Sequence, residues 1–251
     1  MKYYQLLLAI TLALALCLGI SSSVIAGPGL SSASGLSNGP LDTLAIKSDV
    51  GVGSGWAYST WGGVTYSNNI YWKQPELHIT QGTKSWDVFA VCVDSAHLIN
   101  TGTSYTNYKV GNYSNGIPTI ESQGDWNKLT YMWSKAIVIT EYDRTALQLA
   151  TWKGEVGDWN SSSRDNFWTS GDGNSAQFYL GDTPDACVKN KAAEFLALGY
   201  NYTGTGQVGD YKIISSDVNQ NFVAAVPEPG TIFAACSILA PVGFVFRRRR
   251  K

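Results

Sequence analysis

Two short runs of this chain contain side chains of types that could do chemistry. Cys92 lies in the apolar run 89–94 (FAVCVD), and Gln148 lies in the run 146–152 (ALQLATW). A cysteine thiolate is a strong nucleophile, and attack of a thiolate on the carbon of a glutamine carboxamide would expel ammonia and leave a thioester. Because an amide is a poor leaving group, the fold would have to hold both side chains in contact and keep water away.

The two runs together resemble the thioester domains of bacterial surface adhesins. In that family a cysteine in an aliphatic or aromatic context is joined to the glutamine of an apolar-Gln-x-x-x-Trp-like motif. The resemblance covers about residues 86–170 and keeps the order of a cysteine strand before a glutamine helix. It implies a bond between Cys92 and Gln148, supporting positions for Asp94 and Trp152, and a covalent link to an amine or hydroxyl of a partner.

The sequence departs from that family at two positions and leaves alternatives open. Val91 stands where an aromatic residue or leucine is commoner, and Leu147 stands where threonine is usual. In an oxidising compartment Cys92 and Cys187 could instead form a disulfide, or both could stay as unlinked thiols. Gln148 could also be a surface amide of its helix, and Asp94 could serve only to orient a loop.

Other chemistry finds little support in the residue pattern. His78 and His97 are the two histidines, and neither has metal-ligand spacing with the other or with a cysteine. No aspartate-rich loop matches a calcium-binding spacing, so no metal and no cofactor are expected. No nucleophile and base can be paired as in a hydrolase. The sequence therefore predicts a protein that is not an enzyme.

Short strands should position Cys92. Residues 27–41 read as a flexible, Gly- and Ser-rich leader, and a domain follows over 42–226. Both faces of the run 86–94 are apolar, which predicts a single central, buried strand. The other expected strands are 64–66, 70–72, 77–80, 108–110, 211–214 and 221–225.

Helical spacing should position Gln148. One helix is expected from Asp125 as N-cap and runs to about Ile137, and a second is expected over 144–153 with Asp143 as N-cap. A third is expected from Thr183–Pro184 to Gly199. Strands, then two to three helices, then strands again predict an α+β domain that is rich in β-structure.

The N-terminus has the pattern of a secretory signal peptide over 1–26. Lys2 precedes the apolar run Leu6–Gly19, and small residues ending at Ala26 form a cleavage site. A transmembrane anchor is the alternative, but the apolar run is short for one.

The C-terminus, 227–251, resembles the PEP-CTERM sorting signal of Gram-negative bacteria. Its parts are Pro227, Glu228 and Pro229, an apolar run Ile232–Phe246 expected to be a single helix, and a basic end of Arg247, Arg248, Arg249, Arg250 and Lys251. The basic end should stay on the cytoplasmic side of the inner membrane. The resemblance implies processing by an exosortase and final placement at the cell surface or in the extracellular matrix; an ordinary tail anchor is the alternative.

Charge and composition limit the partners of the middle segment. Residues 27–226 keep 12 Lys+Arg and 18 Asp+Glu, a net charge of −6, which argues against nucleic acid. All nine Trp lie in this segment. The two resemblances imply an exported adhesin with a Cys–Gln thioester. The alternative is a module that binds exopolysaccharide through aromatic side chains and contains a Cys92–Cys187 disulfide.

Overall fold

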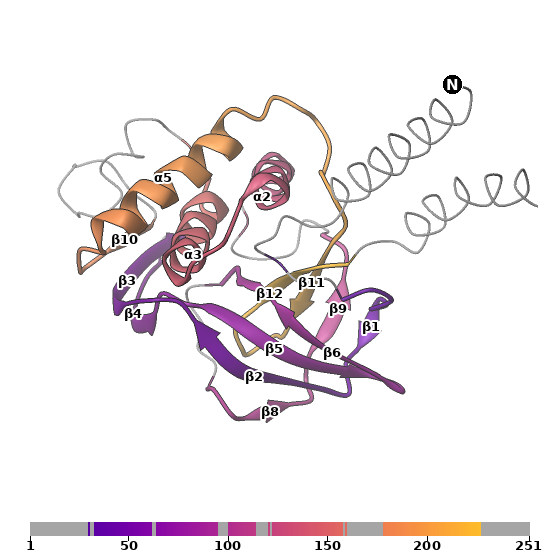
Figure 1. The fold of residues 1–251 in the computed structure, drawn as a ribbon. Helices are drawn as coiled ribbons and strands as arrows, with labels where there is room; N and C mark the ends of the chain where they lie inside the picture. The colour runs from indigo at the N-terminus through magenta and orange to yellow at the C-terminus, as the bar shows by residue number, and fades with distance from the viewer. Residues whose placement is uncertain are drawn as a thin grey trace, which may run out of the picture.

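A computed structural model describes residues 30, 33–61, 64–94, 100–113, 120, 122–157, 159 and 178–226. These residues form three antiparallel sheets and three helices (Figure 1), which confirms the α+β class. The five-stranded sheet has the order β1 (Gly39–Pro40), β9 (Lys109–Gly111), β11 (Tyr211–Ser215), β12 (Phe222–Ala225) and β7 (Val91–Cys92). The four-stranded sheet has the order β6 (Lys84–Phe89), β5 (Gln74–Gln81), β2 (Thr43–Val50) and β8 (Ser104–Tyr105). The three-stranded sheet has the order β10 (Phe178–Leu180), β3 (Ser54–Trp61) and β4 (Val64–Tyr71).

The run 86–94 is divided between two sheets, so the prediction of one central strand was wrong. β6 forms one edge of the four-stranded sheet, and β7 forms one edge of the five-stranded sheet. Ala90 lies between them and donates its backbone N–H to Pro75 O at 3.0 Å. The apolar pattern on both faces reflects burial beneath helices and between sheets, since residues 90–94 are all buried.

Two of the three helices in the described ranges begin earlier than the sequence predicts, because Ser and Thr rather than Asp provide their caps. α2 (Gln123–Lys135) is capped by Ser122, and α3 (Glu141–Glu155) is capped by Thr140. The acids expected as caps, Asp125 and Asp143, occupy the third helical position. Asp143 completes a capping box with Thr140.

α5 (Ala186–Tyr200) is capped by Asp185 and begins two residues after the expected Thr183–Pro184 start. Ile137, expected on the first helix, lies beyond the end of α2 and is 60% exposed.

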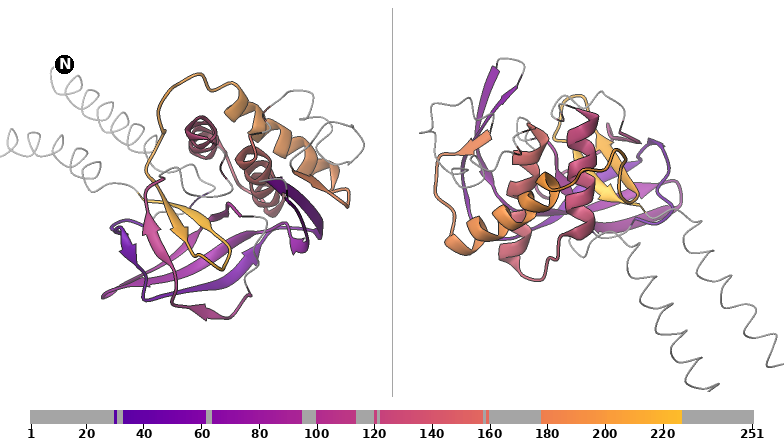
Figure 2. Two further views of the ribbon diagram at one scale, coloured as in Figure 1. Left: turned by 180° about the vertical axis from the view of Figure 1, so that it is seen from behind. Right: turned by 90° about the horizontal axis from the view of Figure 1, so that it is seen from above.

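The central helix α3 brings Gln148 into the core. It packs against α2 and α5 on one side and contacts β2, β5, β7 and β10 on the other (Figures 1 and 2). Every residue from Thr145 to Glu155 is buried, so the helix has no solvent face along that stretch. The amphipathic pattern expected for a surface helix is therefore replaced by burial all round.

The expected flexible leader is mostly packed against the domain. Leu30, Ala33, Leu36 and Leu41 are buried in the core, and Ala33 N–H donates to Ala225 O at 2.9 Å. The Gly and Ser residues suggested flexibility, but leucines spaced among them provide the apolar contacts that fix the segment.

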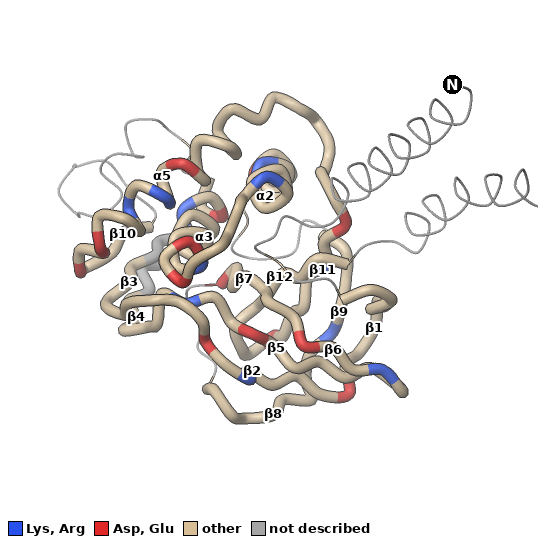
Figure 3. Tube along the Cα trace, viewed as in Figure 1, with Lys and Arg blue, Asp and Glu red and all other residues tan. Residues whose placement is uncertain are grey.

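The segments expected to be a signal peptide and a sorting signal, with Ala26, Pro227, Glu228, Pro229 and the terminal arginines, lie outside the described residues. Within the described ranges, no helix is long and apolar enough to span a bilayer. Lys and Arg alternate with Asp and Glu over the helices and strands of these ranges, and no single-sign face dominates the view in Figure 3.

Candidate functional site

The carboxamide of Gln148 is bonded twice to the backbone of Cys92. Cys92 N–H donates to Gln148 Oε1 at 2.9 Å, and Gln148 Nε2 donates to Cys92 O at 2.8 Å. Both residues are buried, Gln148 completely. The fold therefore brings together the two residues that the thioester hypothesis pairs, although they are 56 residues apart in the chain.

The position of β7 at a sheet edge explains why this contact forms. β7 pairs with β12 on one side only, with Cys92 opposite Phe222. The N–H and C=O of Cys92 on the open side would be buried without partners, at a cost of about 1–3 kcal/mol per group. α3 crosses this edge, and its Gln148 side chain supplies one acceptor and one donor in place of a neighbouring strand.

The thiol of Cys92 faces the backbone of Asp94. Cys92 Sγ donates to Asp94 O at 3.3 Å, and Asp94 N–H approaches the sulfur at 3.4 Å. The Asp94 carboxylate accepts from Asn221 Nδ2 at 3.0 Å, and Gln220 Nε2 donates to Asp94 O at 3.1 Å. Asp94 is therefore hydrogen-bonded to the two residues that precede β12.

Burial dominates the acidity of this thiol. Loss of solvent raises the pKa of Cys92 well above its ordinary value, and the charges of Glu155 and Asp94 raise it further. The Asp94 backbone N–H and the Trp152 indole oppose the rise but do not offset it. At neutral pH the thiol is therefore protonated, and its thiolate is a poor leaving group once it is acylated.

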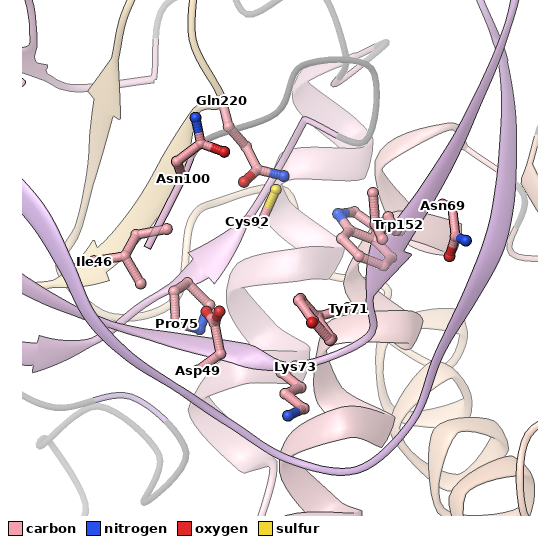
Figure 4. A pocket seen from close by; sticks show the side chains of 11 residues that line it. Ile46, Asp49, Asn69, Tyr71, Lys73, Pro75, Cys92, Asn100, Trp152 and Gln220 are labelled. Atoms are coloured by element: carbon pink, nitrogen blue, oxygen red, sulfur yellow. The ribbon is translucent and has the colours of Figure 1, made fainter. Parts of the chain in front are cut away.

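Trp152 borders the same thiol. Its indole Nε1 is buried and meets no acceptor in full hydrogen-bond geometry within the described chain, although it is close enough to lower the pKa of Cys92 slightly. Figure 4 shows the nitrogen on the side of the ring that faces Cys92. The indole N–H is thus placed to stabilise negative charge that develops on the sulfur.

The sulfur opens into a pocket of about 210 Å³. Cys92 and Trp152 both line it and are both buried (Figure 4). The other lining residues come from several separate segments: Ile46, Asp49, Asn69, Ile70, Tyr71, Lys73, Pro75, Asn100 and Gln220. Sequence reasoning did not find this lining, because no local motif links residues that come together only through the sheets.

Asp49 and Lys73 are the two charged residues of the pocket lining. Partial burial raises the pKa of Asp49, while a hydrogen bond from Thr101 at 3.1 Å and the charge of Lys73 counteract the rise. The two charges offset each other, so the pocket is close to neutral overall.

Cys187 does not line the pocket at Cys92. It lies in the first turn of α5, is exposed, and forms no disulfide with the buried Cys92. The structure therefore does not contain the Cys92–Cys187 disulfide that the sequence left open as an alternative. His78 bonds Asp87 on an exposed strand surface, whereas His97 lies outside the described residues. Across the described ranges, no cluster of His, Cys, Asp and Glu could hold a metal ion.

No family model, curated protein or solved structure matches this chain. Any functional conclusion must therefore come from the chemistry of the Cys92–Gln148 site and from the sequence patterns of the two ends.

Proposed function

We propose that this protein is an exported surface protein whose Cys92 and Gln148 form an internal thioester that links it covalently to a partner. The observation that carries the proposal is the double hydrogen bond between the Gln148 carboxamide and the Cys92 backbone in a buried site. This contact holds the carboxamide beside the residue whose sulfur would attack it, although the sulfur itself contacts the Asp94 backbone. Proximity is what attack on an unactivated amide requires.

Formation of the thioester balances without a cofactor. The Cys92 thiol loses its proton, the sulfur attacks the carboxamide carbon of Gln148, and the carbon–nitrogen bond breaks. The nitrogen leaves as ammonia and takes up the proton. Because Cys92 N–H already donates to Oε1, it can stabilise the negative oxygen of the tetrahedral intermediate.

The same surroundings would preserve the product until a partner arrives. Burial of both residues limits hydrolysis, and the raised pKa of Cys92 slows departure of its thiolate. The pocket reaches Cys92, and through it an amine or a hydroxyl would approach the thioester; Gln148 itself does not line the pocket. Each molecule reacts once, so the protein is a covalent adhesin and not an enzyme.

The two ends of the chain determine where the protein is placed in this proposal. The signal peptide over 1–26 directs export, and the segment 227–251 holds the precursor in the inner membrane until an exosortase removes it. The processed protein then belongs to the cell surface or extracellular matrix of a Gram-negative bacterium.

Methylamine incorporation tests the proposal. Methylamine should attack the thioester, convert Gln148 to its N-methylamide and free the Cys92 thiol, as located by peptide mapping. Cys92→Ala and Gln148→Ala should incorporate none, while the matched variant Cys187→Ala should incorporate as much as wild type. Absence of incorporation into native wild type, or equal incorporation into Cys92→Ala, would contradict the proposal.

A further inference from the structure

The pocket over Cys92 combines apolar surface with uncharged polar groups. Asn69, Asn100 and Gln220 provide carboxamides, which can donate and accept hydrogen bonds at the same time. The charges of Asp49 and Lys73 oppose each other, so a lysine ammonium gains little net attraction. Paired donors and acceptors on a neutral surface match the hydroxyl groups of a sugar better than the charged end of a lysine.

Aromatic side chains complete this lining. Tyr71 is 63% exposed, and Trp152 is buried; both line the pocket (Figure 4). Tyrosine and tryptophan rings offer apolar surfaces on which the C–H faces of a sugar ring can pack. The pocket volume of about 210 Å³ is below the ~300–1,000 Å³ of sites for drug-sized ligands. It therefore suits one sugar unit rather than a folded peptide segment.

A hydroxyl nucleophile also needs a base, because it must lose its proton as it attacks. Asp49 is the carboxylate of the pocket lining, and Thr101 Oγ1 orients it by donating to Oδ2. Partial burial raises the pKa of Asp49, which makes it a stronger base than an exposed aspartate.

We propose that this pocket takes one neutral sugar unit of a polysaccharide and presents its hydroxyl to the Cys92–Gln148 thioester, with Asp49 as the base. This inference rests on the proposed thioester. The hydroxyl oxygen bonds to the Gln148 carbonyl carbon, and the bond from that carbon to Cys92 Sγ breaks. The hydroxyl proton passes to Asp49 and then to the Cys92 thiolate. The product is an ester between Gln148 and the sugar, with a free Cys92 thiol.

The test compares a hydroxyl probe with an amine probe on the full chain purified from a Gram-negative host. Dextran is the neutral polysaccharide, and Nα-acetyl-lysine amide presents the lysine amine. Alkaline hydroxylamine cleaves esters and leaves amides intact, so it identifies the bond formed. Wild type should form a dextran adduct that hydroxylamine releases, and Asp49→Asn should form it about 10²-fold more slowly or less.

Two controls separate a lost base from a lost fold. Asp49→Asn should still lose ammonia and should react with concentrated methylamine at the wild-type rate, because an excess of free amine serves as its own base. Glu194→Gln removes an exposed carboxylate of α5 that does not line the pocket, and it should leave both reactions unchanged.

The outcomes distinguish this inference from the proposed function. A chain that has lost ammonia but forms only hydroxylamine-resistant lysine adducts would overturn the sugar inference alone. An unchanged dextran rate in Asp49→Asn would overturn the assignment of the base. A wild-type chain that never loses ammonia would overturn the proposed function, and the ester with it.

Discussion

Replacement of Gln148 tests whether its side chain stabilises the open edge of β7, independently of any thioester. The substitution is made in a Cys92→Ala chain, in which no thioester can form but the backbone of residue 92 remains. Gln148 then still accepts from one backbone N–H and donates to one backbone C=O, and both groups are buried. Each unpaired buried group costs about 1–3 kcal/mol. Gln148→Met should therefore lower the free energy of unfolding by about 2–6 kcal/mol.

Methionine is the sharper substitution because it roughly conserves volume and removes only the hydrogen bonds. Gln148→Ala should lower the free energy of unfolding further, since it also leaves a cavity beneath β7. The assay is urea unfolding at constant pH, with the parent Cys92→Ala chain measured beside the variants. A loss below about 0.5 kcal/mol in Gln148→Met, within the range of neutral surface changes, would refute the capping of the β7 edge.

Three further predictions follow from the same contacts. Methylamine should open the covalent loop between Cys92 and Gln148, which are 56 residues apart. A disulfide closing a loop of that size stabilises a protein by about 4 kcal/mol, so the free energy of unfolding in urea should fall by about that amount. An unchanged unfolding midpoint would contradict the cross-link. Iodoacetamide should label the exposed Cys187 in the native chain and should leave Cys92 unlabelled until methylamine frees its thiol, as peptide mapping would report; labelling of Cys92 before methylamine treatment would contradict the thioester. Asp143→Asn should destabilise the start of α3 by about 1 kcal/mol at neutral pH. Burial raises the pKa of Asp143, but hydrogen bonds from the N–H groups of Thr140 and Ile139 lower it below the ordinary aspartate value. The stabilisation by the Asp143 carboxylate is therefore complete above the ordinary aspartate pKa and disappears as the pH falls through the folded-state pKa. A stability difference between wild type and Asp143→Asn that is as large at low pH as at neutral pH would exclude this origin.

The elements were largely predictable from periodicity, but their junctions were not. The apolar run 86–94 correctly marked a buried segment, yet nothing local indicated that Ala90 passes the chain from one sheet to another. The helices were expected from their apolar spacing. The starts of α2 and α3 were predicted three residues too late, because an aspartate is common both at the N-cap and at the third helical position. Asp125 and Asp143 occupy the third helical position, and Ser122 and Thr140 are the caps.

The candidate site was also predictable only in part. Gln148 was predicted on a helix and Cys92 on a buried strand, and the motif pairing suggested that they meet. The reason for the contact, an open strand edge that needs a donor and an acceptor, is a tertiary feature that neither motif contains. The pocket was not predictable, since Asp49, Tyr71 and Gln220 become neighbours only when β2, β4 and the chain before β12 come together.

The most direct test of the thioester is the intact mass of the secreted wild-type chain under native conditions. The account predicts a mass lower than the sequence requires by one ammonia, about 17 Da, and the full mass in Cys92→Ala. Methylamine should then raise the wild-type mass by one methylamine. A wild-type chain at its full mass, or one that lacks only the two hydrogens of a disulfide, would contradict the thioester.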